Sequence, residues 1–98
     1  MPHFIVYALD KPDRLDRRNA VRDEHRNRLR NPDAAVKVAV AGPMHDAAGR
    51  MIGSMLVIEA ESAAIVEAFV AGDPYVREDV YGEVAVRPFT WGIGNPNG

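Results

Sequence analysis

His25 is the side chain of this sequence best suited to proton transfer, because an imidazole exchanges protons near neutral pH. It belongs to a stripe of residues three or four apart, and such residues share one side of a helix: Leu15, Arg18, Arg22, His25 and Leu29. In a small domain this stripe is usually apolar and faces the core. Here only its ends are apolar, and buried polar groups need partners. The helix is therefore either mostly solvated, or its middle lines a wet cleft.

Three other side chains would complete a site around His25. Asp73, in the turn Gly72-Asp73-Pro74-Tyr75, would supply a carboxylate that orients and charges the imidazole. Arg22, one turn before His25, would hold an anionic oxygen by a forked hydrogen bond. Ser54 would donate a hydrogen bond into the same cleft. Simpler interpretations stay open: an ordinary Asp-Pro turn, a structural or surface histidine, and a serine at the start of a strand.

The residue types disfavour other kinds of site. The chain has no cysteine, so it forms no disulfide and no sulfur-bound metal site. His3 and His45 are isolated, and no spacing of His, Asp and Glu resembles a metal site. There is no glycine-rich phosphate loop and no nucleophile elbow. We expect neither a metal nor a cofactor.

Composition indicates one globular domain. The 98 residues are 47% hydrophobic, which suffices for a thin core. The net charge of −2 argues against binding to nucleic acid or to an anionic membrane. Arginines crowd the first predicted helix among acidic residues, which predicts a mostly solvated face: Arg14, Arg17, Arg18, Arg22, Arg26, Arg28 and Arg30. No apolar run approaches the roughly 18 residues that cross a membrane, and Met1-Pro2-His3 does not begin a signal peptide, so we expect a cytoplasmic protein.

The order of predicted elements is strand, helix, strand, strand, helix, strand. The strands are expected over 3–9, 36–41, 53–60 and 81–89, and the helices over 13–31 and 63–71. Gly42-Pro43 is expected to end the second strand, and residues 44–52 to form a loop. Ser62 is the expected N-cap of the second helix and Gly72 its C-cap. Residues 1–91 form the predicted domain, and 92–98 a flexible tail.

This order is typical of an α+β ferredoxin-like domain, βαββαβ, with an antiparallel four-stranded sheet and two helices on one face. The other sheet face is then bare, and several of its strands are apolar on both sides. We expect a second copy of the chain to cover it. Phe89 and Trp91 are expected to pack at a subunit edge.

Four segments with their order and spacing resemble the YCII-related family of dimeric α/β-barrel, ferredoxin-like proteins. They are Asp10-Lys11-Pro12 after the first strand, Arg22-Asp23-Glu24-His25, Ala41-Gly42-Pro43, and Asp73-Pro74-Tyr75 followed by Val80-Tyr81 and Val86-Arg87-Pro88-Phe89. The resemblance spans about residues 3 to 91. It implies a catalytic or binding pair at His25 and Asp73, with Ser54 lining the same cleft. A similar member acts as a dehydrochlorinase on chloroaromatics, and more distant relatives are muconolactone isomerases and cofactor-free monooxygenases.

Two functions follow as hypotheses. The first is a cofactor-free enzyme of lyase or isomerase type, acting on a small aromatic or lactone-like substrate. In it His25 is the general base or acid, Asp73 its partner and Arg22 the anion holder, while Ser54 and Tyr75 shape the pocket. The second is a non-catalytic dimeric module that binds a small ligand, in which the same pair merely ties two helices together.

Overall fold

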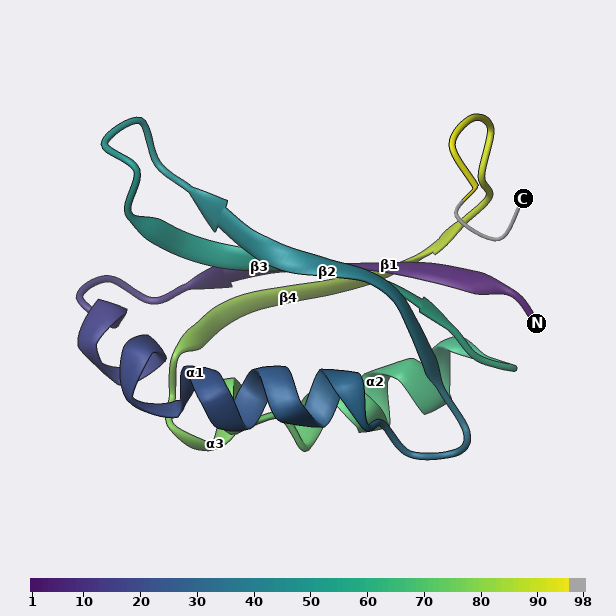
Figure 1. Ribbon diagram of the computed structural model, residues 1–98, viewed down its shortest axis with the longest axis horizontal. Coiled ribbons are helices and arrows are strands. Elements are labelled where there is room, and N and C mark those ends of the chain that lie inside the picture. The colour runs from purple at the N-terminus through teal and green to yellow at the C-terminus, as the bar shows by residue number, and fades with distance from the viewer. Residues whose placement is uncertain (96–98) are drawn as a thin grey trace.

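The computed structural model describes residues 1–95 and confirms the α+β ferredoxin-like fold (Figure 1). Its elements are β1 (His3–Asp10), α1 (Leu15–Arg30), β2 (Lys37–His45), β3 (Met51–Glu59), α2 (Ala63–Ala71), α3 (Pro74–Arg77) and β4 (Tyr81–Phe89). The strands form one antiparallel sheet in the order β2-β3-β1-β4. Figure 1 shows all the helices against one face of this sheet, and the opposite face without a helix. Of the predicted tail 92–98, residues 96–98 lie outside the described part.

The core lies between the sheet and the helices because alternate residues of the central strands are apolar. Phe4 and Val6 of β1 point to the helical side, and their register partners on β3 are Ile58 and Leu56. They pack against α2, whose buried residues Val66, Phe69 and Val70 recur at helical spacing. β1 is apolar on both faces, as expected of a strand with a neighbour on each side.

β2 is longer than predicted, because Gly42-Pro43 does not end it. The strand continues to His45, and Pro43 is opposite Ser54 of β3. β2 is an edge strand, where the missing N–H of a proline can face away from the ladder. The connecting turn is only 46–50, closed by Asp46 Oδ1, which accepts from the backbone N–H groups of Ala48 and Arg50. As a result β3 begins at Met51, and Ser54 lies within the strand rather than at its start.

The helix ends also differ in part from prediction. α1 begins at Leu15, after Asp13 has adopted a left-handed φ of 61°. Ser62 caps α2 as expected, accepting from the N–H of Ile65. The segment after Gly72 was expected to be a plain turn, but it forms the single helical turn α3. Pro74 occupies the first helical position of α3, where its missing N–H needs no partner.

We expect Gly53→Ala to destabilise the fold by about 1–3 kcal/mol, the usual range for overpacking a tight site. A Cβ at this position would clash with the carbonyl oxygen of Ala8 and would lie 2.8 Å from the terminal methyl group of Met44. Gly42→Ala is the matched control, because a Cβ there meets nothing within 4 Å. Urea denaturation measures both, and equal midpoints for the two variants would contradict the close packing of β1 on β3.

Candidate functional site

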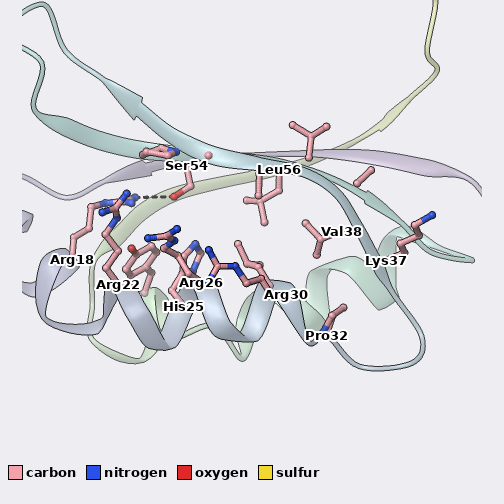
Figure 2. A pocket seen from close by; sticks show the side chains of 17 residues that line it. Arg18, Arg22, His25, Arg26, Arg30, Pro32, Lys37, Val38, Ser54 and Leu56 are labelled. Atoms are coloured by element: carbon pink, nitrogen blue, oxygen red, sulfur yellow. Dashed lines mark hydrogen bonds between the residues drawn. The ribbon is translucent and has the colours of Figure 1, made fainter. Parts of the chain in front are cut away.

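A cleft of about 560 Å³ lies between α1 and the strands β2 and β3. Figure 2 shows the polar side chains of α1 along one wall and the strand side chains along the other. Arg18, Arg22 and His25, the polar middle of the helix stripe, line this cleft. Of the two interpretations of the stripe, the structure supports the wet cleft. Arg18 and His25 are buried there, 2% and 6% exposed.

His25 and Asp73, 48 positions apart in the sequence, are in direct contact. The Nδ1 atom of His25 lies 2.9 Å from Oδ1 and 2.8 Å from Oδ2 of Asp73. An ionised carboxylate only accepts hydrogen bonds, so Nδ1 carries the proton and donates it. The Nε2 atom makes no hydrogen bond with any residue of the described part, and His25 lines the cleft. The pair therefore leaves one ring nitrogen of His25 without a protein partner beside the cleft.

Asp73 is held rigidly by the local structure that follows α2. As the N-cap of α3, its Oδ1 accepts from the backbone N–H of Tyr75 at 2.8 Å. Arg28 Nη1 lies 3.8 Å from Oδ2. Only 3% of the surface of Asp73 is exposed, so water rarely replaces these partners. One side chain thus both begins α3 and orients His25.

Tyr75 lines the cleft and contacts two side chains of the polar stripe, His25 and Arg18. Its ring stacks on the imidazole of His25, with centroids 4.0 Å apart and planes 23° from parallel. The guanidinium carbon of Arg18 lies 4.3 Å from the centroid of the same ring. Tyr75 is completely buried. It fixes the ring plane of His25, as the predicted pocket-shaping role requires, although its contact with a ligand stays a prediction.

Ser54 is tied to a buried ion pair that the sequence reasoning missed. Arg18 donates from Nε and Nη2 to the two oxygens of Asp10, at 2.7 and 2.9 Å, and Nη2 also donates to Ser54 Oγ at 2.8 Å. Burial alone lowers the pKa of Arg18, but the hydrogen bond and charge of Asp10 more than offset it and raise that pKa. Arg18 is therefore a neutralised structural cation. The signal for this pair was the position of Arg18 on the stripe: a buried arginine needs a carboxylate partner, and Asp10 lies nearby at the end of β1.

The remaining arginines of the cleft are not neutralised. Arg22, the predicted anion holder, lines the cleft without a hydrogen bond or ion pair to any described residue. Arg26 and Arg30 also line it, although the sequence predicted a mostly solvated face. The side chains of Arg26 and Arg30 are exposed, so the predicted contact with water is confirmed. The prediction did not include their position along the cleft.

Two buried tyrosines, Tyr75 and Tyr81, pack against each other next to the site. Burial raises the pKa of Tyr81 well above its usual range, an effect that the nearby Ser54 hydroxyl only partly offsets. Burial likewise raises the pKa of Tyr75, against the lowering influence of Arg18. The Tyr81 hydroxyl is buried without a well-formed hydrogen bond to any described residue. Burial thus favours the neutral form of both phenols.

Two further findings concern groups outside the cleft. His3 is not isolated: its Nε2 lies 3.5 Å from Glu59 Oε1, and its ring meets Trp91 edge-on. Phe89 and Trp91 pack on each other at 5.0 Å between centroids. Within residues 1–95, no group of three or more His, Asp and Glu side chains is arranged to hold a metal ion. No helix there is long and apolar enough to cross a membrane.

Known proteins resemble this chain along almost its whole length. The family model described as the YCII-related domain matches residues 2–90. Protein YciI of Escherichia coli O6:H1 is 36% identical over 92 residues, which cover 88% of this chain and 94% of that protein. An uncharacterised protein of Haemophilus influenzae is 31% identical over 93 residues, covering 89% and 95%.

Two solved structures share the fold. The 5-chloro-2-hydroxyhydroquinone dehydrochlorinase of Burkholderia phenoliruptrix AC1100, solved in complex with 2,5-dihydroxybenzoquinone, superposes with a TM-score of 0.82 and 29% identity. The match covers 92% of this chain and 95% of that one. A protein of Bacteroides thetaiotaomicron named as an antibiotic biosynthesis monooxygenase superposes with a TM-score of 0.58 and 18% identity, covering 94% and 90%. The second likeness concerns the fold alone.

We expect the stability of the protein to fall as the pH rises above about 10, where tyrosines of the unfolded chain ionise. The folded state keeps protons on Tyr81 and Tyr75 because burial raises both pKa values. The unfolded state then binds fewer protons, so alkali favours unfolding, by at most about 1.4 kcal/mol per pH unit for each tyrosine. Tyr81→Phe should make this decline shallower, because it removes one of the two buried phenols. Urea midpoints between pH 8 and 11 measure the slopes, and parallel slopes for Tyr81→Phe and the unmodified protein would contradict the assignment.

Proposed function

Because the chain belongs to the YCII-related domain family, we propose that it is a small cofactor-free enzyme of lyase or isomerase type. The observation that carries this proposal is the His25–Asp73 pair. Both carboxylate oxygens lie within 2.9 Å of Nδ1, and this contact leaves Nε2 to face the cleft. An imidazole fixed in one tautomer by a carboxylate is a ready general base, and its protonated form is stabilised by the same partner.

Each residue of the cleft has a role in this proposal. His25 Nε2 takes a proton from the substrate and returns it elsewhere. Asp73 acts through His25 as a positioning residue. Arg22 holds an oxygen that becomes negative during the reaction, for which a free guanidinium is suited. Ser54 accepts from Arg18 and so has its own hydroxyl hydrogen to donate. Tyr75 stacks on His25 and shapes the pocket.

Removal of HCl from a chlorinated hydroxyquinol is the reaction that we propose to test first, on the likeness to the dehydrochlorinase. His25 takes a hydroxyl proton, and the ring carbon that bears chlorine gains a proton. A second hydroxyl then loses its proton, and chloride leaves with the electron pair of the carbon–chlorine bond. The product is a hydroxyquinone, and the sum is loss of HCl. The hydroquinone ring is oxidised to a quinone as the carbon–chlorine bond is replaced by a carbon–hydrogen bond, so no external electron acceptor is needed.

A non-catalytic ligand-binding module is the second candidate function. This function is favoured because Asp73 also has a structural role: it caps α3 and connects α3 to His25 of α1. Breaking one side of a buried charged pair typically costs about 3–5 kcal/mol. In this case His25 and Asp73 would hold the helices together, and the cleft would bind without reacting.

His25→Ala should lower turnover by about 10²–10⁴-fold while the protein stays folded, the usual contribution of a positioned acid–base group. The assay is chloride release from 5-chloro-2-hydroxyhydroquinone, run beside thermal melts. Asp73→Asn should lose turnover as well, since its amide no longer supplies a charge. His45→Ala, at an exposed histidine of β2, is the control and should behave as the unmodified protein. Undiminished turnover in His25→Ala would refute the enzyme; loss of stability with ligand binding retained and no turnover in any variant would favour the module.

We also propose that the sheet face without helices binds a second copy of this chain. Ile5 and Tyr7 alternate with the core residues of β1, so they point to this face. Tyr7 is 45% exposed and lies between Met55 and Ala85 on the flanking strands. A second copy would bring the same apolar surface to it in a two-fold arrangement.

Tyr7→Glu should dissociate the proposed dimer, because a carboxylate at the centre of an apolar interface is left unpaired. Tyr7→Phe keeps the ring and should keep the dimer. Sedimentation equilibrium of the three proteins measures the association constants, and we expect a weakening of at least about a hundredfold for Tyr7→Glu. A monomer for the unmodified protein at micromolar concentration would rule out this proposal.

A further inference from the structure

Four arginines of α1 recur at intervals of four residues: Arg18, Arg22, Arg26 and Arg30. Side chains at this spacing lie above one another on a helix, so like charges repel. Figure 2 shows these four residues following one another along α1, beside the cleft that all of them line. Only Arg18 is neutralised, by Asp10. Lys37, at the far end of the cleft, has Glu59 at 3.6 Å.

Arg22, Arg26 and Arg30 have no hydrogen bond or ion pair with any residue of the described part of the chain. This distinguishes them from Arg28 on the same helix, which donates to the Phe69 carbonyl and lies near Asp73. No Asp or Glu side chain lines the cleft. Three unneutralised guanidinium groups therefore face one cavity of about 560 Å³, a volume typical of a small-ligand pocket.

The wall opposite the arginines is apolar. It is formed by side chains of β2 and β3, among them Val38, Pro43 and Leu56. Leu29 adds an apolar group from α1 itself. A molecule that fits both walls has a flat or extended apolar body, which lies against the strands, and acid groups along the edge that faces α1.

We propose that the cleft is built for a small molecule with an apolar body and at least two acid groups. One acid group lies at Arg22, close to His25, and the second is held further along α1 by Arg26 and Arg30. Guanidinium groups bind carboxylate and phosphate oxygens in the same forked manner, so the acid chemistry is shared by both. The inference rests on the proposed function in one respect: it assumes that the reaction takes place at the end of the ligand next to His25.

The spacing of the arginines sets the size of such a ligand. Four residues of helix advance about 6 Å, so Arg22 and Arg26 leave α1 about one turn apart. Acid groups at opposite positions of a benzene ring are separated by a comparable length. Arg30 lies about one further helical turn from Arg26, so the second acid group of a longer diacid could also contact a guanidinium group.

Binding of simple aromatic acids tests the inference without any turnover. The probes are terephthalate, with two opposed carboxylates, benzoate, with one, and benzamide, with none. Isothermal titration calorimetry measures their affinities for the unmodified protein, for Arg26→Gln with Arg30→Gln, and for the control Arg17→Gln with Arg50→Gln. The control removes the same charge from exposed arginines outside the cleft. Thermal melts establish that all three proteins are folded.

We expect the unmodified protein to bind terephthalate at least about tenfold more tightly than benzoate, and benzoate more tightly than benzamide. The double variant of Arg26 and Arg30 should lose this tenfold preference and keep its affinity for benzoate. The control variant should stay within about twofold of the unmodified protein for every probe. A fourth probe, 4-phosphonobenzoate, distinguishes the sources of the second acid: tighter binding than terephthalate assigns it to a phosphate-like group, and weaker binding to a carboxylate.

Equal affinities for terephthalate and benzoate would overturn the inference, as would an equal loss in the control variant or no binding of either acid. His25→Ala separates this result from the proposed function. If that variant keeps full turnover while the preference for the diacid is present, the proposed function fails and the acid subsite stands. If it loses turnover while the preference is absent, the subsite fails and the proposed function stands.

Discussion

The carboxylate of Asp73 is the point on which the arrangement of the helices and of the site depends. It is almost completely buried, and a buried charge is tolerated only where hydrogen bonds and opposite charge compensate for lost hydration. The cap of α3 and the ring of His25 supply that compensation from two different elements. Because this compensation comes from both elements, the end of α2, the start of α3 and the middle of α1 must meet at one place. The free nitrogen of His25 is a consequence of that meeting.

The fold was predictable from this sequence because its elements have strong local signals. Strand-forming runs on both sides of the helix at 15–30, and Ser62 and Gly72 at the ends of α2, placed almost every element within a few residues. The errors lie at Pro43 and at Pro74. Both were interpreted as breaks, yet each has an environment in which a missing N–H does no harm, at a sheet edge and in a first helical turn. Neither environment is visible before the strand order and the cap are known.

The site was predictable only in part. A polar middle in a helix stripe correctly indicated a cleft, and Asp73 was correctly matched to His25. The pairing of Arg18 with Asp10 was missed because nothing local joins the end of a strand to a helix eight residues later. The row of arginines was interpreted from its average charge, which the interleaved acids cancel. The spacing of four residues carries the information, since it separates the arginines from those acids on the helix surface.

The charged side chains of the cleft therefore form two groups, which suit different roles. Around His25 the buried charges have partners: Asp10 with Arg18, and Asp73 with His25. Such groups hold fixed positions because moving them would leave a charge unpaired in a poorly hydrated region. Further along α1, the side chains of Arg26 and Arg30 are exposed, so they are hydrated and free to reorganise around a ligand. Attraction of an acid by Arg26 and Arg30 and chemistry at His25 then require different residues. For that reason a change at Arg26 or Arg30 should alter which acids bind, and a change at His25 should alter what happens to them.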